Sequence, residues 1–244
     1  MLRAAAALDV ERLRDAGVVT EAGFAAVELS APPDADAGAA ELLGTEGLAT
    51  AAVVLLLRPW QPAAVALAGL ETALDAVEEL VGDDRALVPL LVAASDDAER
   101  AAAAGEVEQH RHLWTRGAAL GAVLDATHRA AERCQERGLV PAFLPRPGSA
   151  IESPREVDTL ANDLDLDLVR LALDVEGLRR AGGEPLAFVA EFAEIVGHVR
   201  VGDDLAVLAP LAAAGYGGWV AADVALDAAA LATARERLAE AGVE

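Results

Sequence analysis

Arginine and carboxylate side chains follow three apolar runs in the second half of the chain. The runs are Leu139–Phe143, Leu168–Leu173 and His198–Val201. The polar residues at or just after the ends of these runs are Arg146 and Ser149, Asp174 and Glu176, and Arg200 and Asp203. A positioned carboxylate can move a proton, and a guanidinium can stabilise an oxygen that gains negative charge. These residue types predict acid–base chemistry on a small molecule if the fold brings them together.

The order of elements around these residues indicates how they could meet. Each apolar run is followed by a polar loop and then by a helical pattern, which is a strand–loop–helix unit repeated along the chain. In a barrel of parallel strands, the residues at the carboxyl ends of the strands face one mouth. The repeat therefore predicts that the three pairs share a single site.

The rest of the chain continues this alternation. Further strands are expected at Ala4–Leu8, Phe24–Leu29, Leu48–Leu57, Ala86–Ala93 and Trp219–Ala222. The expected helices are Asp9–Ala22, Ala37–Thr45, Pro62–Val81 with a stop at Gly82–Asp84, Val107–Arg137 after a short excursion, Pro154–Leu164, Pro185–Ile195, Asp204–Ala214 and Ala225–Ala241. Eight such units in 244 residues predict an α/β fold, a single (β/α)8 barrel domain over residues 1–244.

The charge of the chain limits its partners. The formal net charge is −22 and the sequence contains no lysine. Such a surface repels phosphate backbones and anionic lipid headgroups, so we expect neither nucleic acid nor membrane as a partner. The absence of lysine excludes Schiff-base chemistry. A small molecule is the expected partner, and self-association stays open.

Cysteine usage and hydropathy favour a cytoplasmic protein. Cys134 is the one cysteine, so no internal disulfide can form, and its helical context predicts a packed thiol. The first residues lack the long apolar segment of a secretion signal. The longest apolar run, Ala51–Leu57, is too short to span a bilayer.

Several short motifs resemble a known family. They are LPRPGS from Leu144, ESPREVD from Glu152, LDVEG from Leu173, AGGEP from Ala181, HVRVGD from His198 and GYGGWVAAD from Gly215. They resemble the xylose isomerase-like barrels that include inosose dehydratases and sugar phosphate isomerases or epimerases, most clearly from Gly138 to Asp223. The resemblance implies a sugar or cyclic-polyol isomerase, epimerase or dehydratase. It also implies one divalent ion at the barrel mouth.

The implied metal ligands are only partly present. The resemblance places the four ligands at Leu144, Asp174, Arg200 and Asp223. Leucine has no donor atom, and a guanidinium cannot coordinate a cation. We therefore expect no metal cofactor, although two carboxylates with water could still hold Mg²⁺ or Mn²⁺. A displaced alignment that makes His198 a ligand is the alternative, and a structural histidine is the plainer interpretation.

The candidate site residues fall into two groups. Proton transfer is assigned to Glu28, Asp174, Glu176 and Asp223. Substrate binding is assigned to Arg58, Trp60, Arg146 and Arg200, with the two last stabilising an enediolate in place of a metal. For Arg58 and Trp60, a capping arginine and a half-buried indole is the simpler interpretation. The alternative for the whole chain is a non-catalytic barrel that binds a ligand or a partner protein.

Overall fold

Parallel strands close into a barrel in the computed structural model, which describes residues 1–32, 38–81 and 86–244. The strands are β1 (Arg3–Leu8), β2 (Ala26–Leu29), β3 (Ala49–Leu57), β4 (Val88–Ala93), β5 (Ala142–Phe143), β6 (Arg170–Asp174), β7 (Val196–Val201) and β8 (Trp219–Ala222). Each strand pairs with the next, and β8 pairs with β1. The fold is a (β/α)8 TIM barrel, as the sequence predicts.

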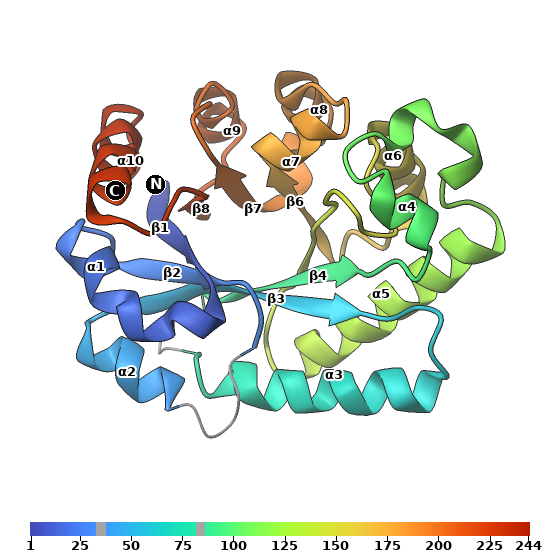
Figure 1. Ribbon diagram of the computed structural model, residues 1–244, viewed down its shortest axis with the longest axis horizontal. Helices are drawn as coiled ribbons and strands as arrows, with labels where there is room; N and C mark the ends of the chain where they lie inside the picture. Colours follow the sequence, from blue (N-terminus) through green and yellow to red (C-terminus); the bar gives the residue numbers. More distant parts are fainter. Residues whose placement is uncertain (33–37, 82–85) are drawn as a thin grey trace.

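Helices surround the strands on the outside (Figure 1). They are α1 (Ala16–Glu21), α2 (Ala39–Thr45), α3 (Ala63–Glu78), α4 (Ala98–Ala102), α5 (Ala118–Glu136), α6 (Pro154–Asp163), α7 (Val175–Arg180), α8 (Pro185–Phe192), α9 (Leu208–Ala213) and α10 (Ala228–Glu240). Short 3-10 turns lie at Val10–Asp15, Val107–Gln109, Arg111–Leu113 and Ala193–Ile195. None of the helices in the described residues is long and apolar enough to cross a membrane.

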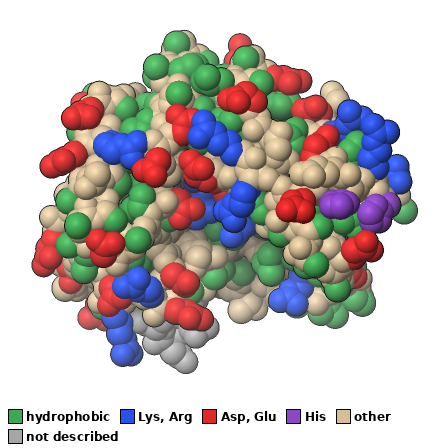
Figure 2. Space-filling model, turned by 45° about the horizontal axis from the view of Figure 1, so that its top comes forward, with side chains coloured by type: hydrophobic (Ala, Val, Ile, Leu, Met, Phe, Trp, Pro, Cys, Tyr) green, Lys and Arg blue, Asp and Glu red, His purple; other side chains and the backbone are tan. Residues whose placement is uncertain are grey.

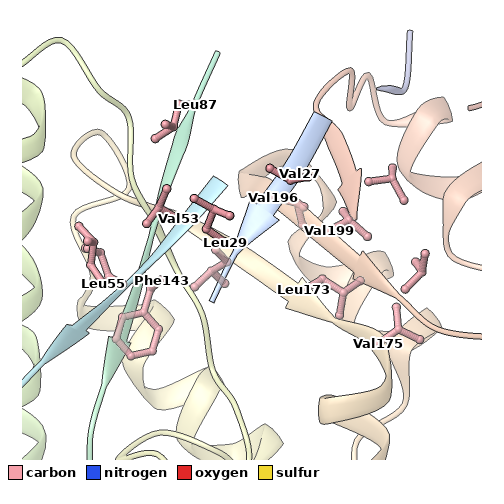
Figure 3. Packing of buried hydrophobic residues seen from close by; sticks show 14 of the residues in the cluster. Val27, Leu29, Val53, Leu55, Leu87, Phe143, Leu173, Val175, Val196 and Val199 are labelled. Atoms are coloured by element: carbon pink, nitrogen blue, oxygen red, sulfur yellow. The ribbon is translucent and has the colours of Figure 1, made fainter. Parts of the chain in front are cut away.

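The apolar runs divide their side chains between two layers. On β3, Val53 and Leu55 belong to the large cluster that includes helix residues such as Leu74. Figure 3 shows part of this cluster, including Val53, Leu55 and Phe143. The alternating Val54 packs instead with a second, smaller cluster that includes Leu144. Because side chains alternate along a strand, this second set fills the barrel interior.

The predicted long helix Val107–Arg137 is wrong in its first third. Helix α5 begins only at Ala118, and the chain before it makes two 3-10 turns. Buried Arg100 binds the carbonyl oxygen of Leu113 at 2.6 Å. Gly117 precedes the helix with a positive φ of 56°, a backbone conformation that favours glycine. These long-range contacts and this backbone override the local helical pattern.

Smaller differences occur at other helix ends. Helix α7 is absent from the sequence-based prediction; it begins because the Asp174 side chain caps the amide of Gly177 at 2.8 Å. The helix predicted at Asp204–Ala214 begins at Leu208, since Asp204 instead binds Arg179. The predicted helix start at Ala37 and the helix stop at Gly82–Asp84 lie outside the described residues.

Candidate active site at the barrel mouth

Three charged or polar side chains meet inside the barrel. Glu28 lies on β2, whereas His198 and Arg200 lie on β7. Strands β1 and β8 separate β2 from β7, so contacts between them cross the interior. The Nε2 atom of His198 is 2.6 Å from one carboxylate oxygen of Glu28, and the Nε atom of Arg200 is 2.8 Å from the other. The period-two spacing of His198 and Arg200 puts both on the inner face of β7.

Two further carboxylates approach the Arg200 guanidinium from neighbouring strands. Asp174 ends β6 opposite Arg200 in the strand register. Its Oδ2 atom lies 3.7 Å from Nη1 of Arg200, and Oδ2 of Asp223 lies 3.7 Å from Nη2. We call Glu28, Asp174, His198, Arg200 and Asp223 the mouth cluster. Figure 2 shows acidic and basic side chains bordering a hollow on one face of the molecule.

Burial and ion pairing fix the charge state of Glu28 and Arg200. Burial alone would raise the pKa of Glu28, but Arg200, His198 and Arg146 together lower it below its ordinary value. Burial would likewise lower the pKa of Arg200, and Glu28, Asp223 and Asp174 outweigh that effect and raise it. Glu28 is therefore a stable carboxylate and a weak base. Asp223, with 48% of its side chain exposed, is the accessible carboxylate of the cluster.

Hydrogen bonding in the mouth cluster is incomplete. Nε of Arg200 is close to Oε1 of Glu28, yet neither atom makes a hydrogen bond with a described residue, so this contact is an ion pair without a directed N–H. The Nδ1 atom of His198 is also buried without a partner in the described part of the chain. The 3.7 Å contacts of the terminal nitrogens are too long for hydrogen bonds. The guanidinium is thus held electrostatically while its donors stay uncommitted.

Arg146 brings a second cation toward the cluster. It follows β5 and is half-buried, and its charge contributes to lowering the pKa of Glu28. It forms no ion pair with another described residue. Its loop is held by the Glu152 side chain, which accepts from the amides of Gly148 at 2.6 Å and Gly105 at 2.7 Å. The helix-start carboxylate Glu152 therefore has a structural role, and it fixes the loop from which Arg146 projects.

Three predicted site residues do not join the cluster. Glu176 lies on α7, with 42% of its side chain exposed and 4.0 Å from Arg179. Arg58 is exposed after β3. Trp60 is 40% exposed and lines a separate cavity. The sequence thus places Asp174 and Arg200 at the ends of neighbouring strands, but it does not indicate which side chains turn inward.

Sequence reasoning left the place of His198 open and missed Arg100. The spacing of His198 two residues before Arg200 is the signal that places it on the inner face of β7. Arg100 lies on the short helix α4, is 2% exposed and pairs with Glu156 at 2.8 Å. No local sequence pattern predicts this ion pair, because Arg100 and Glu156 are 56 residues apart in the sequence.

The donor set of the mouth does not fit the divalent ion that the motifs imply. Leu144, at one ligand position, is fully buried in the apolar layer inside the barrel. At another ligand position, the Arg200 guanidinium stands between Asp174 and Asp223. In the described residues, no group of three or more His, Cys, Asp or Glu side chains is placed to hold a metal. A fixed organic cation lies where a metal would have to bind both carboxylates.

Comparisons with known proteins agree on the fold. No family model matches the chain. An inosose dehydratase from Geobacillus kaustophilus (strain HTA426) is 30% identical over 81 residues, which is 33% of this chain and 26% of the dehydratase. The matched segment thus spans about a quarter of that protein.

Solved structures cover nearly the whole chain at low identity. A D-allulose 3-epimerase from Methylomonas sp. superposes with a TM-score of 0.74 at 13% identity, covering 98% of both chains. A 3-keto-D-glucoside 4-epimerase from E. coli gives 0.70 at 16%, covering 99% of both. A family 2 AP endonuclease from Brucella melitensis gives 0.69 at 20%, covering 98% of this chain and 99% of its own. The chain therefore has the fold of the xylose isomerase-like TIM barrels, as its motifs suggest.

Proposed function

We propose that this protein is a sugar or cyclic-polyol isomerase, epimerase or dehydratase that works with an arginine in place of a metal. The supporting observation is Arg200, a buried cation fixed by Glu28, whose terminal donors make no hydrogen bond with a described residue. Its position at the mouth of a xylose isomerase-like barrel adds to this. The solved epimerases and the dehydratase in the comparisons act on sugars or an inosose according to their names.

The residues of the mouth divide the work of an enolisation. Removal of a proton next to a carbonyl leaves negative charge on the carbonyl oxygen, and Arg200 with Arg146 would stabilise that oxygen. Asp223 is accessible enough to take the proton, and Asp174 stands on the other side of the same guanidinium. Glu28, a weak base, acts by orienting Arg200. Return of the proton to the opposite face of the same carbon gives epimerisation. Its delivery to the former carbonyl carbon gives isomerisation. Loss of a β-hydroxyl as water from the same intermediate gives dehydration.

A non-catalytic barrel is the second candidate. The Arg200 side chain is only 11% exposed and has carboxylates on three sides. A cation neutralised this fully could serve the fold alone. In that case the chain would bind a ligand or partner without reacting with it.

Nucleic acid remains an unsuitable partner despite the likeness to an AP endonuclease. That likeness is at 20% identity and supports the fold alone. The net charge of −22 opposes binding to a phosphate backbone. We therefore propose a small sugar, polyol or sugar acid as the ligand, in a cytoplasmic setting.

Exchange of the substrate's own protons tests this function before the product is known. Ketoses, aldoses and inososes are incubated with the chelator-treated protein in D2O, and loss of the proton next to the carbonyl is followed by NMR. We expect exchange that disappears in Asp223→Asn and in Arg200→Met and survives in Glu191→Gln, a change on α8 away from the mouth. Binding of a sugar without exchange would support the non-catalytic barrel, and exchange that survives Asp223→Asn would overturn the assigned base.

A further inference from the structure

A cavity lies at the same end of the barrel as the mouth cluster. Its volume is about 260 Å³. It is lined by the loops after β3 and β4, by part of the loop after β5, and by the start of α5. Residues after the carboxyl ends of strands lie on one face of such a barrel. None of the five residues of the mouth cluster lines this cavity, which we call the rim pocket.

Most polar side chains around the rim pocket already have a hydrogen-bond or ion-pair partner within the protein. Asp97 caps helix α4 by accepting from the amides of Glu99 and Arg100. Each nitrogen of the Arg100 guanidinium donates to Glu156 or to a carbonyl oxygen. His112 pairs with Glu99 at 2.9 Å. Among the described residues that line the pocket, these groups shape the wall and leave no free cation to attract an anionic ligand.

The indole of Trp114, which lines the rim pocket, also has partners within the protein. Trp114 donates its N–H to the carbonyl oxygen of Val107 at 3.0 Å. The guanidinium of Arg155 lies over its ring, 4.8 Å from the centroid. Trp114 is therefore part of the wall. The floor is apolar, formed by Leu113, Ala119 and Val123 among others.

Two groups at the pocket are uncommitted. Trp60 is 40% exposed and makes no hydrogen bond or ring contact with another described residue. Asp96 is exposed, and its carboxylate likewise has no partner in the described part of the chain. An indole face and a free carboxylate over an apolar floor suit a ring with a C–H face and hydroxyl groups at its edge.

We propose that the rim pocket binds one uncharged sugar ring, the second unit of a glycoside. Trp60 would stack on the C–H face of the ring, and Asp96 would accept hydrogen bonds from two hydroxyls. The volume is just below the roughly 300–1,000 Å³ of pockets for drug-sized ligands, which fits a single ring. The assignment of this ring to a substrate of the mouth cluster rests on the proposed function. Binding in the rim pocket itself does not depend on it.

The test measures binding of methyl glycosides of glucose, galactose, mannose and xylose by calorimetry. We expect saturable binding of at least one, weakened about tenfold or more in Trp60→Ala and in Asp96→Asn, a loss in the range of one aromatic or charged contact. Binding should persist in Arg200→Met. Leu186→Ala on α8 and Glu106→Gln, both exposed and outside the pocket, are matched controls and should bind as wild type does.

Three results would overturn the proposal. They are no binding of any of the four glycosides, binding indifferent to Trp60→Ala, and binding of tetramethylammonium at this pocket in preference to the sugars. Saturable binding that survives Arg200→Met supports the pocket even if no sugar undergoes proton exchange. In that event the proposed function would fail while the rim pocket stands.

Discussion

Two buried arginine–glutamate pairs in this barrel differ in how completely they are bonded. The first, between Arg100 and Glu156, joins the segment after β4 to the start of α6. Nη1 and Nη2 of Arg100 lie 2.8 Å from the two carboxylate oxygens, and Nε and Nη1 also reach carbonyl oxygens at 2.6 Å. Glu156 accepts further bonds from backbone amides, including that of Thr115 at 2.6 Å. We call this pair the brace.

The second pair, between Arg200 and Glu28, is also buried and much less satisfied. Three fully buried atoms of the mouth cluster lack a hydrogen bond to any described residue: Glu28 Oε1, Arg200 Nε and His198 Nδ1. Buried polar groups are normally bonded, and incomplete bonding costs free energy unless something else completes it. The brace is therefore a structural pair, whereas under the proposed function a bound ligand would complete the hydrogen bonds of the mouth cluster.

The brace gives the largest expected loss. Arg100→Met should lower the free energy of unfolding by about 3–5 kcal/mol, because it leaves the Glu156 carboxylate buried without its ion partner. Denaturant unfolding measures the change. Arg12→Met, which removes an exposed pair with Asp15, is the control and should change little. A loss of unfolding free energy no larger than that of the control would mean that the brace adds no net stability.

The mouth cluster should tolerate the matched change better. In Arg200→Met, Glu28 keeps its 2.6 Å contact with His198, so we expect a loss of about 1–3 kcal/mol together with loss of sugar binding at the mouth. Unfolding and calorimetry are measured on the same preparation. A loss of stability equal to that of Arg100→Met, with no sugar bound at the mouth, would show that the two pairs play the same structural role. That result would favour the non-catalytic barrel.

Acid titration tests the Glu28 and Glu156 carboxylates of the two pairs in a second way. The pKa values of both Glu28 and Glu156 are lowered in the folded protein: burial opposes the shift in each, and the paired arginine with its neighbouring hydrogen bonds outweighs it. A lowered folded pKa stabilises the protein above the ordinary value of 4.5, and the stabilisation is lost as the pH falls through the folded pKa.

The unfolding free energy of wild type should therefore fall as the pH drops below about 4.5. The decline should be shallower in Glu156→Gln and in Glu28→Gln, each of which removes one titrating group. Unfolding measured from neutral pH downward gives the slopes. Equal slopes in all three proteins would show that neither carboxylate carries the acid sensitivity.

Parts of this structure follow from the sequence, and the reasons are local. The strand at Trp219–Ala222 and the closed barrel are predicted because apolar period and turn residues agree there. Asp174 and Arg200 are predicted at one mouth because parallel strands end on one side, and the family resemblance adds Asp223. The meeting of Glu28 with His198 depends on strands that are distant in sequence and not adjacent in the barrel, so no local pattern predicts it.

The brace shows the other limit of sequence reasoning. The segment from Val107 to Leu113 has a helical pattern, yet the carbonyl oxygen of Leu113 is bound by Arg100. Local helix preference is worth less than burying this guanidinium with hydrogen bonds from all three of its nitrogen atoms. The same contacts create the rim pocket, which therefore could not be predicted either.

Metal binding is expected to have the smallest effect on the wild-type protein. Arg200 between Asp174 and Asp223, and Leu144 in the apolar layer, leave too few donors for a stable site. We expect less than about one-third of an equivalent of divalent ion after dialysis, and no rise of Tm with Mn²⁺. Metal analysis and thermal unfolding measure both.

A variant with restored donors is the positive control for that measurement. In the triple variant Leu144→Glu, Arg200→His and Asp223→Glu, the carboxylate introduced just after β5, in the apolar layer inside the barrel, would be buried without a partner unless a cation binds. Mn²⁺ should then raise the Tm, by the equivalent of about 2.7 kcal/mol at a hundred times its Kd. Leu144→Gln with the same two other changes has one carboxylate fewer and should respond less. If Mn²⁺ raised the Tm of the wild-type protein as much as that of the triple variant, Arg200 would have to move aside for a metal. The brace and the mouth cluster would then differ as a fixed ion pair differs from a displaceable one.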